Sequence, residues 1–438
     1  MVRAVHIGFL LLTVAYLFPE QALAQGETTS AIIGEVRDTT NAVVADATVT
    51  ITNHETGLKR VAKTDDAGRF NFPQLKPGTY SVTVEARGFD PGRNDNVVSG
   101  LGQKQTVDFT LKVARFNEAV EVSSEAPLIN PENANTSTTL SAPALENLPN
   151  PGGDLTYPLQ FAPGALINTA GSSNDFVGGS NGYGNVEFNG LPALSNGYIV
   201  DGLETNDPLT NLNSGLSTNL VLGLNSISEV TVNTLSYSVD QGRYGASQVD
   251  YVTKSGTNQF HGNLYELWNG ALLNAADYFT NATPGNHKPG STVNHFGGSL
   301  GGPILHDKLF FFFDSEWVRI ALPIVTPTIV PTAAFQQYVL QQLPSPSVPF
   351  YRQMFSLYGN TVGTPTAILG CPLGTAGNGC ANRQSVSHSS DDHEQVQTVR
   401  VDYNISPKDT AWFRFQSDTG LQAAWTDPIN PVFDAFSP

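Results

Sequence analysis

The chain contains little charge and few basic residues. Only 14% of its 438 residues are charged, well below the roughly 25% of an ordinary soluble domain, and 22 Lys and Arg face 39 Asp and Glu. The net charge of −17 excludes a general nucleic-acid-binding protein, because such proteins neutralise phosphates with Lys and Arg. Hydrophobic residues make up 40% of the chain, with 41 Gly and 28 Pro. This composition favours short strands joined by turns, so we expect a mainly β protein.

Long hydrophobic runs are missing beyond the N-terminus. Arg3 precedes the apolar stretch Ile7 to Phe18, and Ala22-Leu23-Ala24, with its two small residues, precedes Gln25, which is the order of a secretory signal peptide. The apolar stretch is shorter than the roughly 20 residues of a transmembrane helix. We therefore predict that residues 1–24 are a signal peptide. If the mature protein is embedded in a membrane, it needs a closed β-barrel to satisfy its backbone polar groups.

Cysteine is almost absent. Cys371 and Cys380 flank a flexible, glycine-containing stretch, and in an exported protein we predict that they form a disulfide. Closing so small a loop constrains the unfolded chain by about 2.5–3 kcal/mol, enough to hold a surface loop but not to organise a domain. Two thiols without a second pair nearby do not make a zinc site.

Alternating apolar residues predict a small β-sandwich over residues 25–112. Turns rich in Asp, Gly and Pro, at Asp65 to Gly68 and Lys76 to Gly78, separate the strands. The alternating sets are Val49 and Ile51, Phe70 and Phe72, Tyr80, Val82 and Val84, and Val107, Phe109 and Leu111.

Local motifs in this module resemble the carboxypeptidase regulatory-like domain. They are Thr64 to Phe72, then Pro77-Gly78-Thr79-Tyr80-Ser81-Val82, then Gly88-Phe89. The resemblance implies a transthyretin-like sandwich without catalysis, and no zinc-peptidase ligand set accompanies it.

Residues 113–257 are polar and rich in Gly and Asn, and on composition they predict an α+β domain with long loops. We expect a short helix at Pro143 to Leu148 and strands at Val186 to Phe188, Gly197 to Val200 and Glu229 to Val232. The order of motifs resembles the plug of TonB-dependent outer-membrane receptors: Phe188-Asn189-Gly190, Tyr198-Ile199-Val200-Asp201-Gly202 and Ile227 to Val232. The stretch Val252 to Gly262 resembles the Oar-like branch, in which a plug strand ends there and the barrel begins.

Residues 258–438 show the alternation of a transmembrane β-barrel. Phe311, Phe313 and Trp317 share one face of a strand and Asp314 and Glu316 the other. A second strand alternates Val399, Val401 and Tyr403 with Thr398, Arg400, Asp402 and Asn404, and a third alternates Ala411, Phe413 and Phe415 with Arg414 and Gln416.

The connections in this part alternate in length. Tight turns at His306 to Lys308 and Ser406 to Asp409 alternate with long connections at Trp268 to Ser291 and Ala321 to His393. We expect about five antiparallel strands, whereas a plugged transporter barrel has about 22. The sequence is therefore expected to be the N-terminal part of a longer protein, with an incomplete barrel. A soluble β-sandwich is the alternative explanation of the same alternation.

Catalytic chemistry finds little support. Gly297 to Gly301 matches the hydrolase elbow around Ser299, but a Phe-rich strand follows it where the elbow requires a helix. His388, Asp391, Asp392, His393 and Glu394 could hold a divalent metal, and we interpret them instead as a solvated stretch of outer loop leading into a strand. We expect no catalytic residues, no metal and no cofactor.

The resemblance suggests where partners bind. Apical plug loops of such receptors face the outer vestibule, so Tyr183, Asn185 and the loop residues Thr205, Asn206 and Asp207 are candidate ligand contacts. The coupling box that pairs with TonB lies just before the plug, where this chain has Glu118-Ala119-Val120-Glu121-Val122-Ser123. Alternating Val120 and Val122 suit strand addition. The alternative is that this segment is a strand of the preceding sandwich or a bare linker.

Together these patterns predict an Oar-like, TonB-dependent transporter in the outer membrane of a Gram-negative bacterium. Its expected partners are TonB, outer-membrane lipid and an unidentified extracellular ligand, with no nucleic acid. The competing hypothesis is a secreted binding or adhesion protein built from β modules, possibly one that binds carbohydrate.

Overall fold

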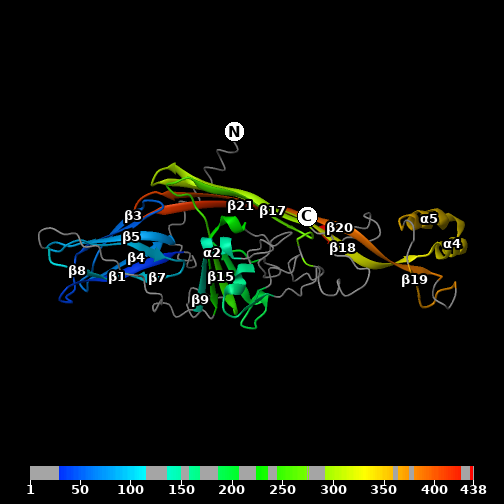
Figure 1. Cartoon of the computed structure of the whole chain (residues 1–438), viewed down its shortest axis with the longest axis horizontal. Helices are drawn as coiled ribbons and strands as arrows, with labels where there is room; N and C mark the ends of the chain where they lie inside the picture. Colours follow the sequence, from blue (N-terminus) through cyan, green and yellow to red (C-terminus); the bar gives the residue numbers. More distant parts are fainter. Residues whose placement is uncertain are drawn as a thin grey trace, which may run out of the picture.

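The computed structural model divides into three units, which we name after the resemblances above: the sandwich, the plug and the barrel wall. It describes residues 29–114, 136–148, 157–167, 186–206, 223–234, 244–273, 275, 292–358, 364–373, 379–425 and 435–437. In Figure 1 the sandwich lies at one end, the plug lies in the middle beneath the long strands of the wall, and these strands run on to a small helical lobe at the other end. Within these ranges no helix is long and apolar enough to cross a membrane.

The sandwich consists of two four-stranded sheets that pack face to face. Alternate residues point into one shared core, which includes Val49, Phe70, Val82 and Phe109, all at most 4% exposed. The predicted alternation is therefore confirmed. One sheet contains β1 (Ser30–Asp38), β4 (Arg69–Leu75), β7 (Lys104–Thr106) and β8 (Phe109–Leu111), and the other β2 (Thr48–Asn53), β3 (Lys59–Lys63), β5 (Gly78–Glu85) and β6 (Gly92–Ser99).

The plug is built on a five-stranded sheet in the order β13-β12-β15-β14-β9, in which β12 and β15 are parallel. The predicted helix is present as α2, and the three predicted strands as β11, β12 and β14. Three further strands, β9, β10 and β13, were not predicted, and β15 ends where the resemblance to the Oar-like branch implies the end of a plug strand. The elements are β9 (Thr136–Ser141), α2 (Ala142–Asn147), η1 (Tyr157–Phe161), β10 (Ala165–Ile167), β11 (Val186–Phe188), η2 (Ala193–Ser195), β12 (Asn196–Val200), β13 (Leu203–Glu204), η3 (Leu224–Ser226), β14 (Ile227–Thr234) and β15 (Ser247–Thr253).

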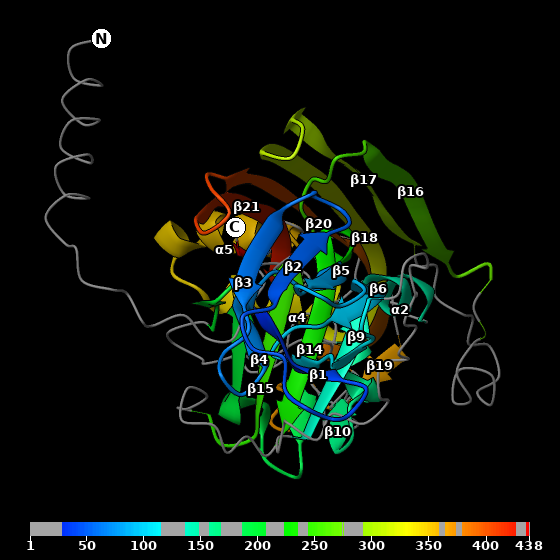
Figure 2. The same cartoon turned by 90° about the vertical axis from the view of Figure 1, so that its left-hand side faces the viewer.

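The barrel wall is an antiparallel sheet in the order β16-β17-β18-β20-β21-β22, and within the described residues its two edges are β16 and β22. Viewed from the end, these strands form an arc over the plug (Figure 2). The predicted alternation is present, since Asp314 and Glu316 of β18 are fully buried while Phe313 is 42% exposed. The strands are β16 (His261–Gly270), β17 (Thr292–Leu305), β18 (Leu309–Pro331), β20 (Ala381–Asn404), β21 (Thr410–Trp425) and β22 (Ala435–Ser437).

The tight turns of the wall lie where the sequence predicts them, but one long connection is shorter than expected. We predicted a loop from Ala321 to His393, and the structure instead continues β18 to Pro331 and starts β20 at Ala381. The two strands stay paired along this whole length, from Leu309 opposite Tyr403 to Pro331 opposite Ala381. The interpretation of His388 to Glu394 as loop is therefore wrong, because this cluster lies within β20.

The connection between β18 and β20 forms the helical lobe of Figure 1. It contains α4 (Ala333–Gln342), η4 (Ser345–Ser347), α5 (Val348–Ser356) and β19 (Thr364–Thr366), and Thr332 caps α4 by accepting a hydrogen bond from the Phe335 N–H. Cys371 and Cys380 form a disulfide at its base, with their Cα atoms 5.8 Å apart.

Candidate functional site at the contact of plug, barrel wall and sandwich

A tight turn after β12 directs a plug carboxylate toward the barrel wall. Asp201 and Gly202 both have positive φ, +48° and +85°, and the Asp201 N–H donates to the carbonyl of Tyr251 on the neighbouring parallel strand β15. The carboxylate accepts hydrogen bonds from the N–H (3.0 Å) and the hydroxyl (2.7 Å) of Thr253 at the end of β15. The turn and β15 together therefore fix the position of Asp201.

Two arginines of the wall reach this carboxylate. Arg400 Nη1 of β20 lies 3.1 Å from Asp201 Oδ1, and Arg414 Nη1 of β21 lies 3.2 Å from Oδ2. Arg400 also donates to the Thr253 hydroxyl at 2.7 Å, and its guanidinium lies over the Trp412 ring. All three charged side chains are less than 10% exposed. Removing one member would leave an opposite charge buried, so this ion cluster holds the plug against the wall.

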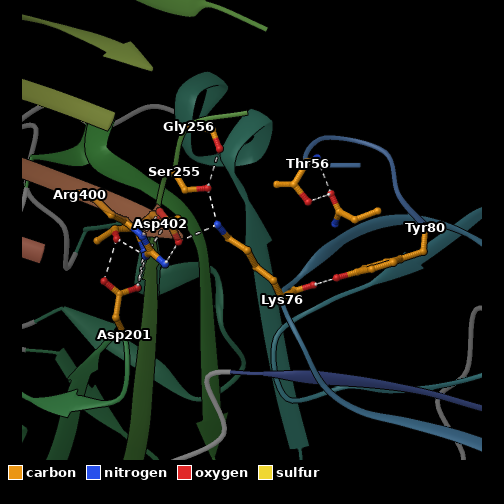
Figure 3. A network of polar contacts seen from close by, with 10 residues as sticks. Thr56, Lys76, Tyr80, Asp201, Ser255, Gly256, Arg400 and Asp402 are labelled. Carbon is orange, nitrogen blue, oxygen red and sulfur yellow. Dashed lines mark hydrogen bonds and ion pairs between the residues drawn. The ribbon is translucent and has the colours of Figure 1, made fainter. Parts of the chain in front are cut away.

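A second wall carboxylate extends the cluster to the sandwich. Asp402 binds Arg400 with both oxygens, at 2.9 Å to Nε and 3.0 Å to Nη2. On its other side Asp402 lies 3.2 Å from Nζ of Lys76, which stands between β4 and β5 of the sandwich and also donates to the hydroxyl of Ser255. Figure 3 shows this continuous path from Lys76 through Asp402 and Arg400 to Asp201. We call these residues and Arg414 the clamp.

Neutral plug groups meet wall carboxylates at a separate contact. The Asn225 backbone N–H of η3 donates to Glu316 at 3.0 Å, and its side-chain amide donates to Asp314 at 2.8 Å. Glu316 also lies 2.7 Å from Nε2 of His295, which lies 3.1 Å from the Tyr265 hydroxyl. We call this group the Asn225 contact.

Glycines allow the closest approaches between the plug segments and the wall. A Cβ at Gly223 would overlap the Glu316 carboxylate, and one at Gly256 would overlap the backbone carbonyls of Phe311 and Gly302. Gly256 lies within the stretch Val252 to Gly262 that resembles the Oar-like branch. Its place explains why the chain between plug and wall needs glycine there.

Further contacts dock the sandwich on the plug and the wall. The Leu101 N–H, in the turn after β6, donates to the carboxylate of Glu229 on β14, 3.2 Å from Oε1. The Asn258 N–H, between β15 and β16, donates to the Glu55 carbonyl of the sandwich at 2.9 Å, and its side-chain amide donates to Asp307 at 2.7 Å.

Burial shifts the pKa of both charged groups that the sandwich and the plug bring to this interface. It lowers the pKa of Lys76, against the raising effect of Asp402. It raises the pKa of Glu229, against the lowering effect of the Leu101 hydrogen bond. Each charged form is therefore held by its partner at some desolvation cost.

Most of the predicted site residues lie outside the described part of the chain. These are Glu118 to Ser123, Tyr183, Asn185 and Asp207. Thr205 and Asn206 are described, and both bind the backbone of β12: the Thr205 N–H donates to Tyr198 O at 2.9 Å, and Asn206 Nδ2 donates to Asn196 O at 2.9 Å. Their polar groups hold the segment after β13 in place.

The clamp and the Asn225 contact were not predicted as sites. The signal was present, since Asp201 lies in the motif Tyr198 to Gly202 and Arg400, Asp402 and Arg414 lie on the predicted polar faces of two strands. The sequence does not show which residue on these polar strand faces contacts which residue of the plug.

Known families match two parts of the chain. The carboxypeptidase regulatory-like domain matches residues 31–112, and the outer membrane beta barrel domain matches residues 252–433. The TonB-dependent transporter Oar of Myxococcus xanthus is 30% identical over 304 residues, which are 68% of this chain and 27% of that protein. The chain thus spans little more than a quarter of the length of this curated relative.

Solved structures of outer-membrane receptors also resemble the chain. The ferric enterobactin receptor of Pseudomonas aeruginosa is 14% identical with a TM-score of 0.36, covering 66% of this chain and 34% of the receptor. The outer membrane transporter YddB of Escherichia coli is 11% identical with a TM-score of 0.35, covering 66% and 36%. From the family matches and the Oar relative, the chain belongs to the TonB-dependent receptors of the Gram-negative outer membrane, with a carboxypeptidase regulatory-like domain ahead of the plug.

Proposed function

We propose that the protein is a TonB-dependent transporter that takes up an unidentified extracellular ligand through a plugged barrel. The observation that carries this proposal is the clamp, because a plug fastened to the inner face of a barrel wall by buried ion pairs closes the lumen until a force displaces it. No bond of the ligand is made or broken in such a cycle. The Oar relative supports the same activity.

The proposed coupling segment, Glu118 to Ser123, lies in the sequence between the sandwich and β9. Among the described residues, β9 is an edge strand of the plug sheet and pairs along one side, with β14, from Ser141 opposite Glu229 to Thr136 opposite Thr234. A pull on the coupling segment would therefore act first on the β9–β14 pairing. Edge pairing is easier to peel than the centre of a sheet, since one row of hydrogen bonds holds it.

TonB is expected to add a strand to the coupling segment, with backbone hydrogen bonds giving affinity and every second side chain giving fit. Val120→Pro removes one backbone donor and should abolish or strongly weaken binding of the purified periplasmic domain of TonB, measured by calorimetry on the detergent-solubilised receptor. Val120→Thr is the matched control, because it keeps the N–H and a similar shape. Equal affinity of both variants would refute the assigned box.

The ligand side of the proposal concerns Tyr183, Asn185, Thr205, Asn206 and Asp207. Thr205 and Asn206 hold the start of their loop on β12, so we propose that they position Asp207 and its neighbours toward the outer vestibule. Asn206→Ala should then reduce uptake by loosening the loop, whereas Asn147→Ala, on the exposed end of α2, should leave uptake unchanged.

Gel mobility tests the transport proposal against the secreted adhesion protein considered from the sequence. A closed barrel in detergent runs differently on a gel before and after boiling. A product that fractionates without detergent and shows one mobility would contradict transport.

A further inference from the structure

The charges of the clamp divide into a balanced core and one excess cation. Asp201 and Asp402 offset Arg400 and Arg414, so the plug and wall residues of the clamp are neutral together without the sandwich. Lys76 adds a third cation, and its side chain is 32% exposed, against 6% for Arg400. Withdrawing the sandwich would thus return Lys76 to water and leave no unpaired charge in the clamp. The Lys76 contact can therefore form and open at a small cost in free energy. Breaking the buried contacts among Asp201, Arg400, Arg414 and Asp402 costs much more.

The charge balance of the clamp differs when the plug moves and takes Asp201 away from the wall. Without Asp201, the clamp has two arginines and one carboxylate, Asp402, an excess of one positive charge. If Lys76 is still docked, the excess within the clamp is two, and Glu55, the other carboxylate that acts on Lys76, belongs to the sandwich and not to the wall. Lys76 therefore makes displacement of Asp201 less favourable, and displacement of Asp201 makes docking of Lys76 less favourable.

From this geometry we propose that the sandwich is a releasable restraint on the plug: docking of Lys76 on Asp402 and seating of Asp201 between Arg400 and Arg414 stabilise each other. The partner surface is intramolecular, formed by the end of the sandwich that carries Glu55, Lys76 and Leu101. The proposal does not rest on transport, since it concerns two equilibria of the same chain. By linkage, any event that unseats the plug would free the sandwich, and any partner that captures the sandwich would loosen the plug.

Three separate contacts show that the docking is a surface rather than one side-chain bond. Lys76 meets Asp402 of the wall, the Leu101 N–H meets Glu229 of the plug, and the Glu55 carbonyl meets Asn258 in the connection between them. Each is polar, and each belongs to a loop or strand end of the sandwich. The Lys76 contact is partly exposed and the Leu101 contact is buried, and an interface made of a few such polar contacts suits a contact that must open.

Two backbone amides report separately on the two equilibria. The Thr253 N–H donates to Asp201 and reports plug seating, and the Leu101 N–H donates to Glu229 and reports docking. Hydrogen exchange of the peptides that carry these amides can be followed by mass spectrometry in the full-length protein purified in detergent. Slow exchange at each site means a closed contact.

We expect Lys76→Met to speed exchange at both reporters roughly two- to fivefold, the size set by a partly exposed ion pair. Lys59→Met, on the exposed face of β3 in the same sandwich, removes the same charge away from the interface and should change neither. Lys76→Arg should restore slow exchange. If Lys76→Met speeds exchange at Leu101 alone, or at neither site, the coupling is refuted.

The reverse arm tests reciprocity. Asp201→Asn keeps the shape of the side chain and removes its charge, so exchange at Leu101, in a different domain, should rise by a similar factor. Heat-shifted gel mobility checks that this variant still assembles. If it does not, Thr253→Val, which removes one hydrogen bond to Asp201, gives a weaker change of the same sign. Unchanged exchange at Leu101 in an assembled variant would overturn the proposal.

Discussion

The clamp and the Asn225 contact fasten the same plug to the same wall with opposite chemistry. At the clamp the plug brings the charge, Asp201, and the wall brings Arg400 and Arg414. At the Asn225 contact the wall brings the carboxylates, Asp314 and Glu316, and the plug brings neutral donors.

The difference decides what each contact costs when it opens. If Asp201 leaves, the wall keeps an excess positive charge in a buried position, which is strongly unfavourable. If Asn225 leaves, Glu316 still has His295 and Tyr265 close by, and Asp314 loses one neutral hydrogen bond. The clamp therefore sets the main resistance to plug movement, and the Asn225 contact fixes the register at lower cost.

The largest expected effect comes from breaking the clamp. Arg400→Ala removes the ion pairs to Asp201 and Asp402 and should lower the free energy of plug opening by about 3–5 kcal/mol. Hydrogen exchange of the β15 amides measures this opening. Arg319→Ala, an exposed arginine of the same wall, is the control and should have little effect. Similar exchange in both variants would show that the clamp does not hold the plug.

An intermediate effect is expected at the Asn225 contact. Asn225→Ala leaves Asp314 without its amide donor and should cost about 1–3 kcal/mol in the same measurement. Asn225→Asp should cost more than Asn225→Ala, because it places a third carboxylate beside Asp314 and Glu316. If the aspartate variant were as stable as the wild type, the contact would not be governed by the wall carboxylates, and the contrast with the clamp would fail.

The smallest effect is expected when a change of pH titrates Glu229 and thereby alters the docking of the sandwich. Glu229 lies at the sandwich interface. Its pKa is raised by burial above the ordinary value of 4.5, so the docked state binds more protons than the undocked state. Docking should therefore be strongest at low pH and weaken as the pH rises from 4.5 through the raised pKa. Glu229→Gln should flatten the pH dependence of docking. The measurement is the Leu101 exchange rate of the variant relative to wild type at each pH.

Sequence patterns predicted the elements of the fold better than their ends. Alternation placed β2, β4, β5 and β8 of the sandwich and β18, β20 and β21 of the wall, and local strand signals placed three plug strands. Alternation did not show β9, which is a polar run, Thr-Ser-Thr-Thr-Leu-Ser, or β15, which is buried on both faces. It did not show β10 and β13 either, because they have only three and two residues. The length of β18 and β20 beyond Ala321 and His393 was missed because their extension is stabilised by pairing with each other, which only the register of the two strands reveals.

The disulfide and the site residues show the same limit. The pairing of Cys371 with Cys380 follows from there being no other cysteine. Asp201, Arg400 and Arg414 are up to 213 positions apart in the chain, so nothing local marks them as partners.

By itself the sequence determined the three-part β architecture, the buried faces of its strands and the acidic, base-poor composition, because each depends on the alternation of neighbouring residues or on residue counts. Only the tertiary structure decided that Lys76, Asp402, Arg400 and Asp201 meet, because the parallel pairing of β12 with β15 and the register of β20 with β21 bring together charges from three domains.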